Sequence, residues 1–218
     1  MTENKRILII SDSLALPRSK PEEMLYEDTY PYMLRSDYEV FQISFGGGTI
    51  KEIVHQTHYY LSYKPDIIIL HLGIVDCAYR TFPVFVDKGA VYSKFLDLYR
   101  RALAKIISPR FLRRLFRFRY TKPSDFETSL YVLKKEFPDS KLLAIGIVPA
   151  SNDYVKLVPG IDKSIIQYND IIKRVVGPGF INLSELPTNG VMSDHHHINR
   201  IGHQFIYTNI LDTLRQDA

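Results

Sequence analysis

The chain has 218 residues, of which 45% are hydrophobic and 24% charged. This length and composition are typical of one soluble globular domain with a full hydrophobic core, and the chain is short for two. The longest apolar runs, such as residues 67–70, are far below the roughly 20 residues that a transmembrane helix needs. We therefore expect one soluble domain covering residues 1–218.

The N-terminal apolar run, residues 7–10, is interrupted by Ser11 and Asp12. It is too short for the apolar region of a signal peptide, so we interpret it as a first core strand. Cys77 is the single cysteine, which excludes an internal disulfide bond. We therefore expect a cytoplasmic protein.

Positive charge is concentrated in residues 100–122, which contain nine basic residues and no acidic one. The remainder of the chain has 19 basic and 24 acidic residues. We interpret residues 81–123 as an insertion or lid that includes this basic helical segment. A solvated amphipathic helix, contact with an anionic ligand and contact with a membrane surface all remain open. No motif indicates nucleic-acid binding, and none is expected.

Apolar runs rich in β-branched residues alternate with stretches of helical periodicity along the chain. The predicted strands cover residues 6–11, 38–44, 66–72, 141–147 and 180–183. The predicted helices cover residues 22–35, 50–62, 92–107, 124–137 and 161–175, with a last helix from Asn199 to about Arg215. This alternation predicts a parallel α/β sheet with helices on both faces.

Polar residues follow the predicted strands where a ligand of an open α/β sheet would bind. Ser11-Asp12-Ser13-Leu14 follows the first strand, and residues 45–49, which contain three glycines, follow the second. Asp76 follows the third strand, and residues 194–199 precede the last helix. Together these segments supply a hydroxyl, glycine amides, carboxylates and an imidazole, which are the groups that nucleophilic acyl transfer requires.

The order of these segments and their residues resemble the motif blocks of the SGNH (GDSL-like) hydrolases. Ser11-Asp12-Ser13-Leu14 matches the family's G-D-S-L block, and Gly47-Gly48-Thr49 matches its second block. Gly73-Ile74-Val75-Asp76 is similar to the third block, G-x-N-D, with Asp76 where the family has Asn. The most specific match is the D-x-x-H block, with Asp194 and His197, followed by Asn199, Gly202 and His203. Tyr168-Asn169 also resembles a recurrent pair in the family.

This resemblance, which runs from Ile7 to about His203, implies a fold and a set of roles. The fold would be a flavodoxin-like three-layer α/β/α sandwich with strand order 2-1-3-4-5. Ser13 would be the nucleophile, His197 the general base, and Asp194 the group that orients His197. The backbone amides of Ser13 and Gly47 would form the oxyanion hole, with the side chain of Asp76 as a third donor. No cofactor is implied.

Asp76 departs from the family pattern in a way that affects chemistry, because an ionised carboxylate accepts hydrogen bonds and cannot donate one. Either Asp76 is protonated, or it points elsewhere, or the chemistry is altered. Residues 73–78 resemble a variant block associated with bacterial polysaccharide gene clusters. The resemblance implies an esterase that removes an acyl group, such as acetyl, from a carbohydrate. Transfer of an acyl group to a sugar, or sugar binding with weak catalysis, are the alternatives.

Structural readings compete with these roles. Ser13 could be a helix N-cap, but the Asp194–His197 block favours the nucleophile. The three glycines at 46–48 lack both the spacing and the lysine of phosphate-binding loops. Residues 195–197 are three consecutive histidines, but no glutamate stands at the spacing of zinc hydrolases, so we predict no metal. We expect His195 and His196 to line a pocket or lie in a solvated loop.

Overall fold

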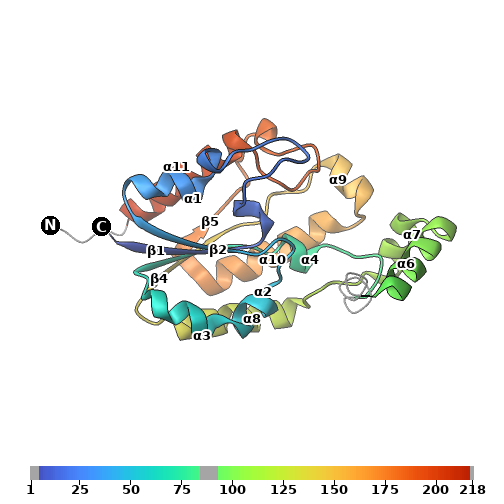
Figure 1. Ribbon diagram of the computed structural model, residues 1–218, viewed down its shortest axis with the longest axis horizontal. Helices are drawn as coiled ribbons and strands as arrows, with labels where there is room; N and C mark the ends of the chain where they lie inside the picture. Colours follow the sequence, from blue (N-terminus) through green and yellow to red (C-terminus); the bar gives the residue numbers. More distant parts are fainter. Residues whose placement is uncertain (1–4, 84–92, 217–218) are drawn as a thin grey trace.

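The computed structural model describes residues 5–83 and 93–216, which form a three-layer α/β/α sandwich (Figure 1). Its middle layer is a sheet of five parallel strands in the order β2-β1-β3-β4-β5, which confirms the expected topology. The strands are β1 (Arg6–Ser11), β2 (Glu39–Ser44), β3 (Ile67–His71), β4 (Lys141–Ile145) and β5 (Phe180–Ile181).

The central strand β1 explains why the apolar runs are continuous rather than alternating. Successive side chains of a strand point to opposite faces of the sheet. Leu8 and Ile10 pack into the hydrophobic cluster on one face, whereas Ile7 and Ile9 pack into the cluster on the other. All four are fully buried, because helices cover both faces.

The helices divide between the two faces of the sheet (Figure 1). One face is covered by α2 (Ile50–His55), α3 (Thr57–Tyr60), α8 (Pro123–Glu136) and α10 (Ile161–Val176), and the other by α1 (Tyr30–Met33) and α11 (Arg200–Arg215). The short α4 (Ile74–Cys77) directly follows β3. The predicted bounds of α8, α10 and α11 agree with the structure to within one residue.

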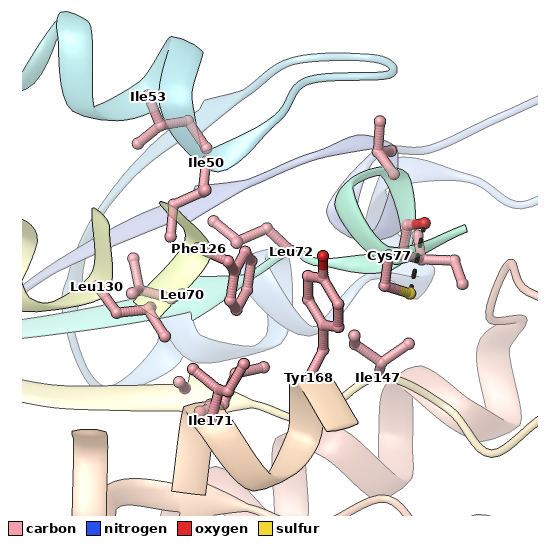
Figure 2. Close-up of a cluster of buried hydrophobic side chains, with 14 of the residues drawn as sticks. Ile50, Ile53, Leu70, Leu72, Cys77, Phe126, Leu130, Ile147, Tyr168 and Ile171 are labelled. Atoms are coloured by element: carbon pink, nitrogen blue, oxygen red, sulfur yellow. Dashed lines mark hydrogen bonds between the residues drawn. The ribbon is translucent and has the colours of Figure 1, made fainter. Parts of the chain in front are cut away.

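Figure 2 shows the core beneath α8 and α10, which fixes the loop after β3. The rings of Phe126 and Tyr168 lie 4.9 Å apart, and Ile147 packs beside them. Gly73 has φ +122°, and a Cβ at this position would lie 2.9 Å from Cδ1 of Ile147. A side chain at residue 73 would therefore displace the core and disturb the turn that leads into α4.

Two predicted helices are wrong in part. Residues 22–35 form no single helix, because the chain makes a 3₁₀ turn at Tyr26–Asp28 and then the one-turn α1, in which Pro31 occupies the first turn and cannot donate a backbone hydrogen bond. Residues 50–62 divide at Gln56, whose φ of −107° separates α2 from α3. The helix α9 (Asn152–Leu157) was not predicted at all, because it is only six residues long.

The basic segment forms two helices, α6 (Lys94–Ile106) and α7 (Pro109–Phe116). The predicted start of the first helix, at Tyr92, lies outside the described residues. The chain leaves the helical conformation after Ile106, and Pro109 stands in the first turn of α7. Within residues 5–83 and 93–216, no helix is both long enough and apolar enough to cross a membrane.

Candidate active site

Ser13 lies at the carboxyl end of β1, where the strand turns into a short 3₁₀ helix, Ser13–Ala15. Asp12 caps this helix, because its Oδ1 accepts a hydrogen bond of 2.9 Å from the amide of Leu14. The cap is therefore Asp12, and the hydroxyl of Ser13 stays available for other contacts. Arg18 holds the turn from the other side by donating from Nη2 to the carbonyl oxygen of Ser13.

The structure brings the three predicted catalytic side chains into one chain of contacts. Ser13 Oγ lies 3.0 Å from His197 Nε2, and His197 Nδ1 lies 2.5 Å from Asp194 Oδ2. Asp194 Oδ1 also accepts a hydrogen bond of 3.0 Å from the backbone amide of His197. The carboxylate thus fixes both the ring and the backbone of His197, which is the nucleophile–base–orienting group geometry of a catalytic triad.

The electrostatics of this triad favour a neutral imidazole. Burial lowers the pKa of His197 to about 4; the hydrogen bond that His197 donates to Asp194 opposes this shift, and the nearby His196 and Arg18 add to it. Burial alone would raise the pKa of Asp194, but its hydrogen bonds with His197 outweigh that effect and lower it to about 2. At neutral pH, His197 is therefore a free base beside an ionised carboxylate.

The residues that follow His197 explain why this block has a recognisable pattern. Asn199 caps α11 by accepting from the amides of Ile201 and Gly202, and it donates from Nδ2 to the carbonyl of Asn189. A Cβ at Gly202 would lie 2.4 Å from the carbonyl oxygen of Gly190, so this position requires a residue without a side chain. The start of α11 therefore packs closely against residues 189–190, just before the loop that carries Asp194 and His197.

The two backbone amides that are expected to form the oxyanion hole belong to neighbouring turns. The turn at residues 45–48 follows β2, and the amide of Phe45 donates to the carbonyl of Ser11, so this turn lies beside the Ser13 turn. Gly47 has φ +70°, which favours glycine, and it is exposed. Among the hydrogen bonds of the described residues, none uses the amide of Ser13 or Gly47 as donor. Their role as oxyanion donors stays a prediction.

Asp76 is fully buried in α4 and faces groups that donate to it. The amide of Ile50, the first residue of α2, lies 3.2 and 3.3 Å from its two carboxyl oxygens, and Thr121 donates from Oγ1 to Oδ1 at 2.5 Å. The side chain therefore acts as an acceptor that ties α4 to the start of α2. Its expected role as an oxyanion donor stays a prediction, and these contacts favour a structural role.

His195 and His196 lie beside the triad rather than within it. Tyr154 of α9 stacks on both imidazoles, with ring centroids 6.2 and 5.9 Å away, and Ser151 Oγ lies 3.3 Å from Nδ1 of His195. His195 adopts φ +70°, an uncommon value for a residue with a side chain. These contacts brace the loop from the α9 side.

The ligand atoms of Asp194, His196 and His197 lie within 4.8 Å of one another, so these three side chains could hold a metal ion. However, a metal on His197 would compete with its contacts to Ser13 and Asp194, which already satisfy both ring nitrogens. A metal ion and the Ser13 contact would therefore exclude one another at His197.

Sequence reasoning missed Arg18 and Tyr154. Arg18 contacts the backbone of Ser13 and lies close enough to Asp12 and Asp194 to be stabilised as a cation by both, although burial lowers the pKa of its guanidinium. Tyr154 lies in the helix that was not predicted. Neither residue belongs to a recognisable motif, so no local signal in the sequence identified them.

An apolar pocket of about 330 Å³ borders the histidine loop (residues 195–197) next to the start of α9. Its walls include Val148, Leu183, Val191, Met192 and His195. The catalytic side chains do not line it, so its size does not define the acyl group that Ser13 would receive.

Comparison with known proteins gives structural matches alone. No model of a protein family matches the sequence, and no curated protein does. A lipase/acylhydrolase from Enterococcus faecalis superposes with a TM-score of 0.67 at 14% identity, covering 98% of this chain and 96% of that chain. Esterase EstA from Pseudoalteromonas sp. superposes with a TM-score of 0.60 at 14% identity, covering 98% of each chain. Phospholipase A1 from Streptomyces albidoflavus NA297 superposes with a TM-score of 0.59 at 12% identity, covering 99% of this chain and 100% of that chain.

The match to each of these neighbours extends over nearly the whole chain, from β1 to α11, and is not limited to a single motif. The chain therefore has the fold of these hydrolases, which lipolytic proteins of the G-D-S-L family also share, as the resemblance in its sequence implied. Because the identities are low, the likeness establishes the fold, and the chemistry must be argued from the site itself.

Proposed function

We propose that the protein is a serine ester hydrolase in which Ser13, His197 and Asp194 form the catalytic triad. The observation that carries this proposal is the continuous contact from Ser13 Oγ through the imidazole of His197 to the carboxylate of Asp194. The lipase, esterase and phospholipase names of the structural neighbours support the same reaction class.

In the proposed mechanism, one group serves each step of ester hydrolysis. Neutral His197 donates from Nδ1 to Asp194 and accepts the proton of Ser13 at Nε2 while Oγ attacks the acyl carbon. The amides of Ser13 and Gly47 stabilise the resulting oxyanion. His197 then protonates the leaving alcohol, which leaves an acyl-serine. A water molecule, deprotonated by His197, attacks that ester, and His197 then returns the proton to Ser13 Oγ as the acid leaves.

For the substrate, we propose a small acyl group such as acetyl on a carbohydrate. The support is the resemblance of residues 73–78 to a block associated with polysaccharide gene clusters. Acyl transfer to a sugar uses the same acyl-serine with a sugar hydroxyl in place of water, and it is the second candidate. A cytoplasmic location, expected from the single cysteine, belongs to the same proposal.

Labelling with an organophosphate tests the proposal directly. We expect one phosphorylated residue, mapped by mass spectrometry to Ser13, and loss of labelling in Ser13→Ala. Hydrolysis of a chromogenic acetyl ester should be lost in the same variant and should survive a metal chelator. Labelling that persists in Ser13→Ala would overturn the assignment, and loss of activity with the chelator would favour a metal at Asp194, His196 and His197.

Substrate class requires a second measurement. Esters of one chromogenic alcohol with acyl chains of two to twelve carbons, followed by acetylated sugars, would define the acyl group and the alcohol. We expect the acetyl ester to give the highest kcat/KM. A preference for long chains would contradict the proposed acyl group and leave the serine mechanism intact.

A further inference from the structure

The helices α6 and α7 form a pair, here called the α6–α7 hairpin (residues 93–117), at the end of the molecule far from both termini (Figure 1). Its inner side is held by a small hydrophobic cluster in which Phe82 and Leu112 are buried and Leu103 and Ile107 pack against them. No residue of α6 is itself buried. The hairpin therefore has an anchored inner side and an outer side that faces solvent.

The outer side carries a concentrated set of large apolar side chains. On α6, Phe95, Leu98, Tyr99 and Ile106 are 48–79% exposed. Their spacing of three, four and eleven residues from Phe95 places them on one stripe of the helix. On α7, three more residues are 52–59% exposed, namely Phe111, Leu115 and Phe116. Seven of the fifteen exposed large hydrophobic residues of the described chain thus lie within 22 residues, which marks a contact surface.

Basic side chains flank these apolar residues. The hairpin has eight basic residues and one acidic residue, Asp97, which already pairs with Arg100 at 3.1 Å and with Arg101 at 2.8 Å. On α7, Arg110 and Arg114 are exposed and share one side of the helix, and the exposed Arg117 follows as its C-cap residue. The remaining basic residues of the hairpin are Lys94, Lys105 and Arg113.

We propose that the α6–α7 hairpin docks on the surface of an anionic lipid bilayer. An apolar stripe bordered by lysine and arginine is complementary to such a surface, where the apolar side chains enter the interface and the cations meet the headgroups. A symmetric dimer through the same face would bring two strongly basic surfaces together, which opposes association. Nucleic acid would use the cations, but it would leave the aliphatic residues Leu98, Ile106 and Leu115 without a partner.

Docking would also position the candidate active site at the bilayer. Arg113 donates from Nη1 to the carbonyl of Leu157 in α9 at 2.9 Å. Tyr154, three residues earlier in α9, stacks on His195 and His196 beside the triad. The hairpin and the histidine loop are therefore linked through a single short helix. The docking inference does not depend on the proposed hydrolase activity, because vesicle binding is measured without turnover.

Co-sedimentation of the full chain with vesicles tests the proposal. The vesicles would contain either pure phosphatidylcholine or a mixture with phosphatidylglycerol. We expect binding to the anionic vesicles, little binding to the neutral ones, and release at high salt. The triple variant Arg110→Gln, Arg114→Gln, Arg117→Gln should bind about 100-fold more weakly. The triple variant Phe95→Ser, Leu98→Ser, Ile106→Ser should lose binding to a similar extent.

Matched controls carry the same types of change elsewhere on the surface. Lys135→Gln, Lys163→Gln, Lys173→Gln removes three exposed cations, and Tyr59→Ser, Ile166→Ser removes two exposed apolar residues. Both controls and Ser13→Ala should bind vesicles like the wild type. Equal binding to both kinds of vesicle, or equal loss in the controls, would overturn the proposal. The proposal would also be overturned if the wild type formed a dimer, bound no vesicles, and became monomeric in the Phe95, Leu98, Ile106 variant. Binding of the wild type to an oligonucleotide but not to vesicles would overturn it as well.

Discussion

The carboxyl of Asp76 accepts a hydrogen bond of 2.5 Å from the hydroxyl of Thr121, and both residues are fully buried. The amide of Ile50 supplies a further donor to the same carboxyl. Asp76 therefore connects three segments that are distant in sequence: α4, the start of α2, and the chain before α8. A residue that is conspicuous because it departs from a catalytic motif thus has a clear structural explanation.

We expect Thr121→Val to destabilise the protein by about 1–3 kcal/mol, because valine matches the shape of threonine but leaves the buried carboxyl with one donor fewer. Thr121→Ser retains the hydroxyl and should cost much less. Urea unfolding of the three proteins measures this difference. Equal stability of the valine variant and the wild type would show that Asp76 does not depend on Thr121.

Asp76→Asn tests the acceptor role against the oxyanion role. Asparagine replaces one carboxyl oxygen with an NH2 group, which donates hydrogen bonds. That group would face either the Ile50 amide or the Thr121 hydroxyl, both of which are donors, so we expect a lower melting temperature. The folded variant should hydrolyse a small ester with a pH profile of the same shape as the wild type. If the variant instead keeps its stability and loses an alkaline limb of kcat/KM, Asp76 donates to the oxyanion as a protonated acid.

The three consecutive histidines should differ sharply in their importance. His197→Ala removes the proposed base and should lower kcat by several orders of magnitude, as removal of a triad member does in serine hydrolases. His196→Ala and His195→Ala remove contacts with Tyr154 and should cost far less. The measurement is kcat for one chromogenic ester. A severe loss in His196→Ala with a mild effect of His197→Ala would show that His196, and not His197, is the base.

Activity should persist to a lower pH than an ordinary histidine base allows. The base works only when deprotonated, and burial lowers the pKa of His197 to about 4. We therefore expect kcat/KM to rise with pH through a midpoint near 4 and to be nearly constant from about pH 6 upward. An acid limb with a midpoint near the ordinary value of 6.5 would show that the imidazole is more hydrated than its contacts suggest. Circular dichroism at each pH separates this effect from unfolding.

The strands and the last three long helices could be predicted because burial imposes a periodic pattern on the sequence. Strand order and the D-x-x-H block followed from the resemblance, since Asn199 and Gly202 have roles that few other residues can fill. The helix α9 and the position of Arg18 could not be predicted. Both depend on contacts between distant segments, and neither short helices nor single arginines carry a local signal.

The division of residues 50–62 at Gln56 has the same origin. Both halves have good helical periodicity, so the sequence favours one continuous helix. The structure interrupts it at Gln56, which caps the end of α2 and the start of α3, so tertiary structure outweighs local preference. For Asp76, the motif predicted a catalytic role. The sequence could not predict the long-range hydrogen bonds from Ile50 and Thr121, which favour a structural role.

A buried polar cluster behind Ser13 gives the last prediction. Asp12 is fully buried, and Oδ2 is among the buried polar atoms that lack a hydrogen-bond partner within the described chain. Tyr30, His71 and His203 also contribute such atoms, and the Tyr30 ring lies 5.6 Å from the His71 ring and 5.5 Å from the His203 ring. Burial is the main cause that raises the pKa of Asp12 from 3.8 to about 8. The native state therefore favours the protonated acid.

We expect Asp12→Asn to become more stable relative to the wild type as pH rises. A raised native pKa means that the contribution of Asp12 to stability is fully present below pH 3.8 and is lost as the pH rises towards 8. Asparagine is neutral at every pH and keeps the oxygen that caps the Leu14 amide, so the variant avoids this loss. Burial lowers the pKa values of His71 and His203 to about 3, which makes both proteins less stable as pH falls from 6.5 towards 3, and this common effect cancels in the comparison.

Free energies of unfolding in urea at pH 5, 6, 7 and 8 measure the difference between Asp12→Asn and the wild type. Asp125→Asn is the control, because its side-chain hydrogen bond with Lys51 lowers the pKa of this exposed carboxyl, so its effect should be constant over the same range. If the difference between Asp12→Asn and the wild type is also constant from pH 5 to 8, Asp12 is ionised behind the nucleophile and the cluster stabilises an anion there.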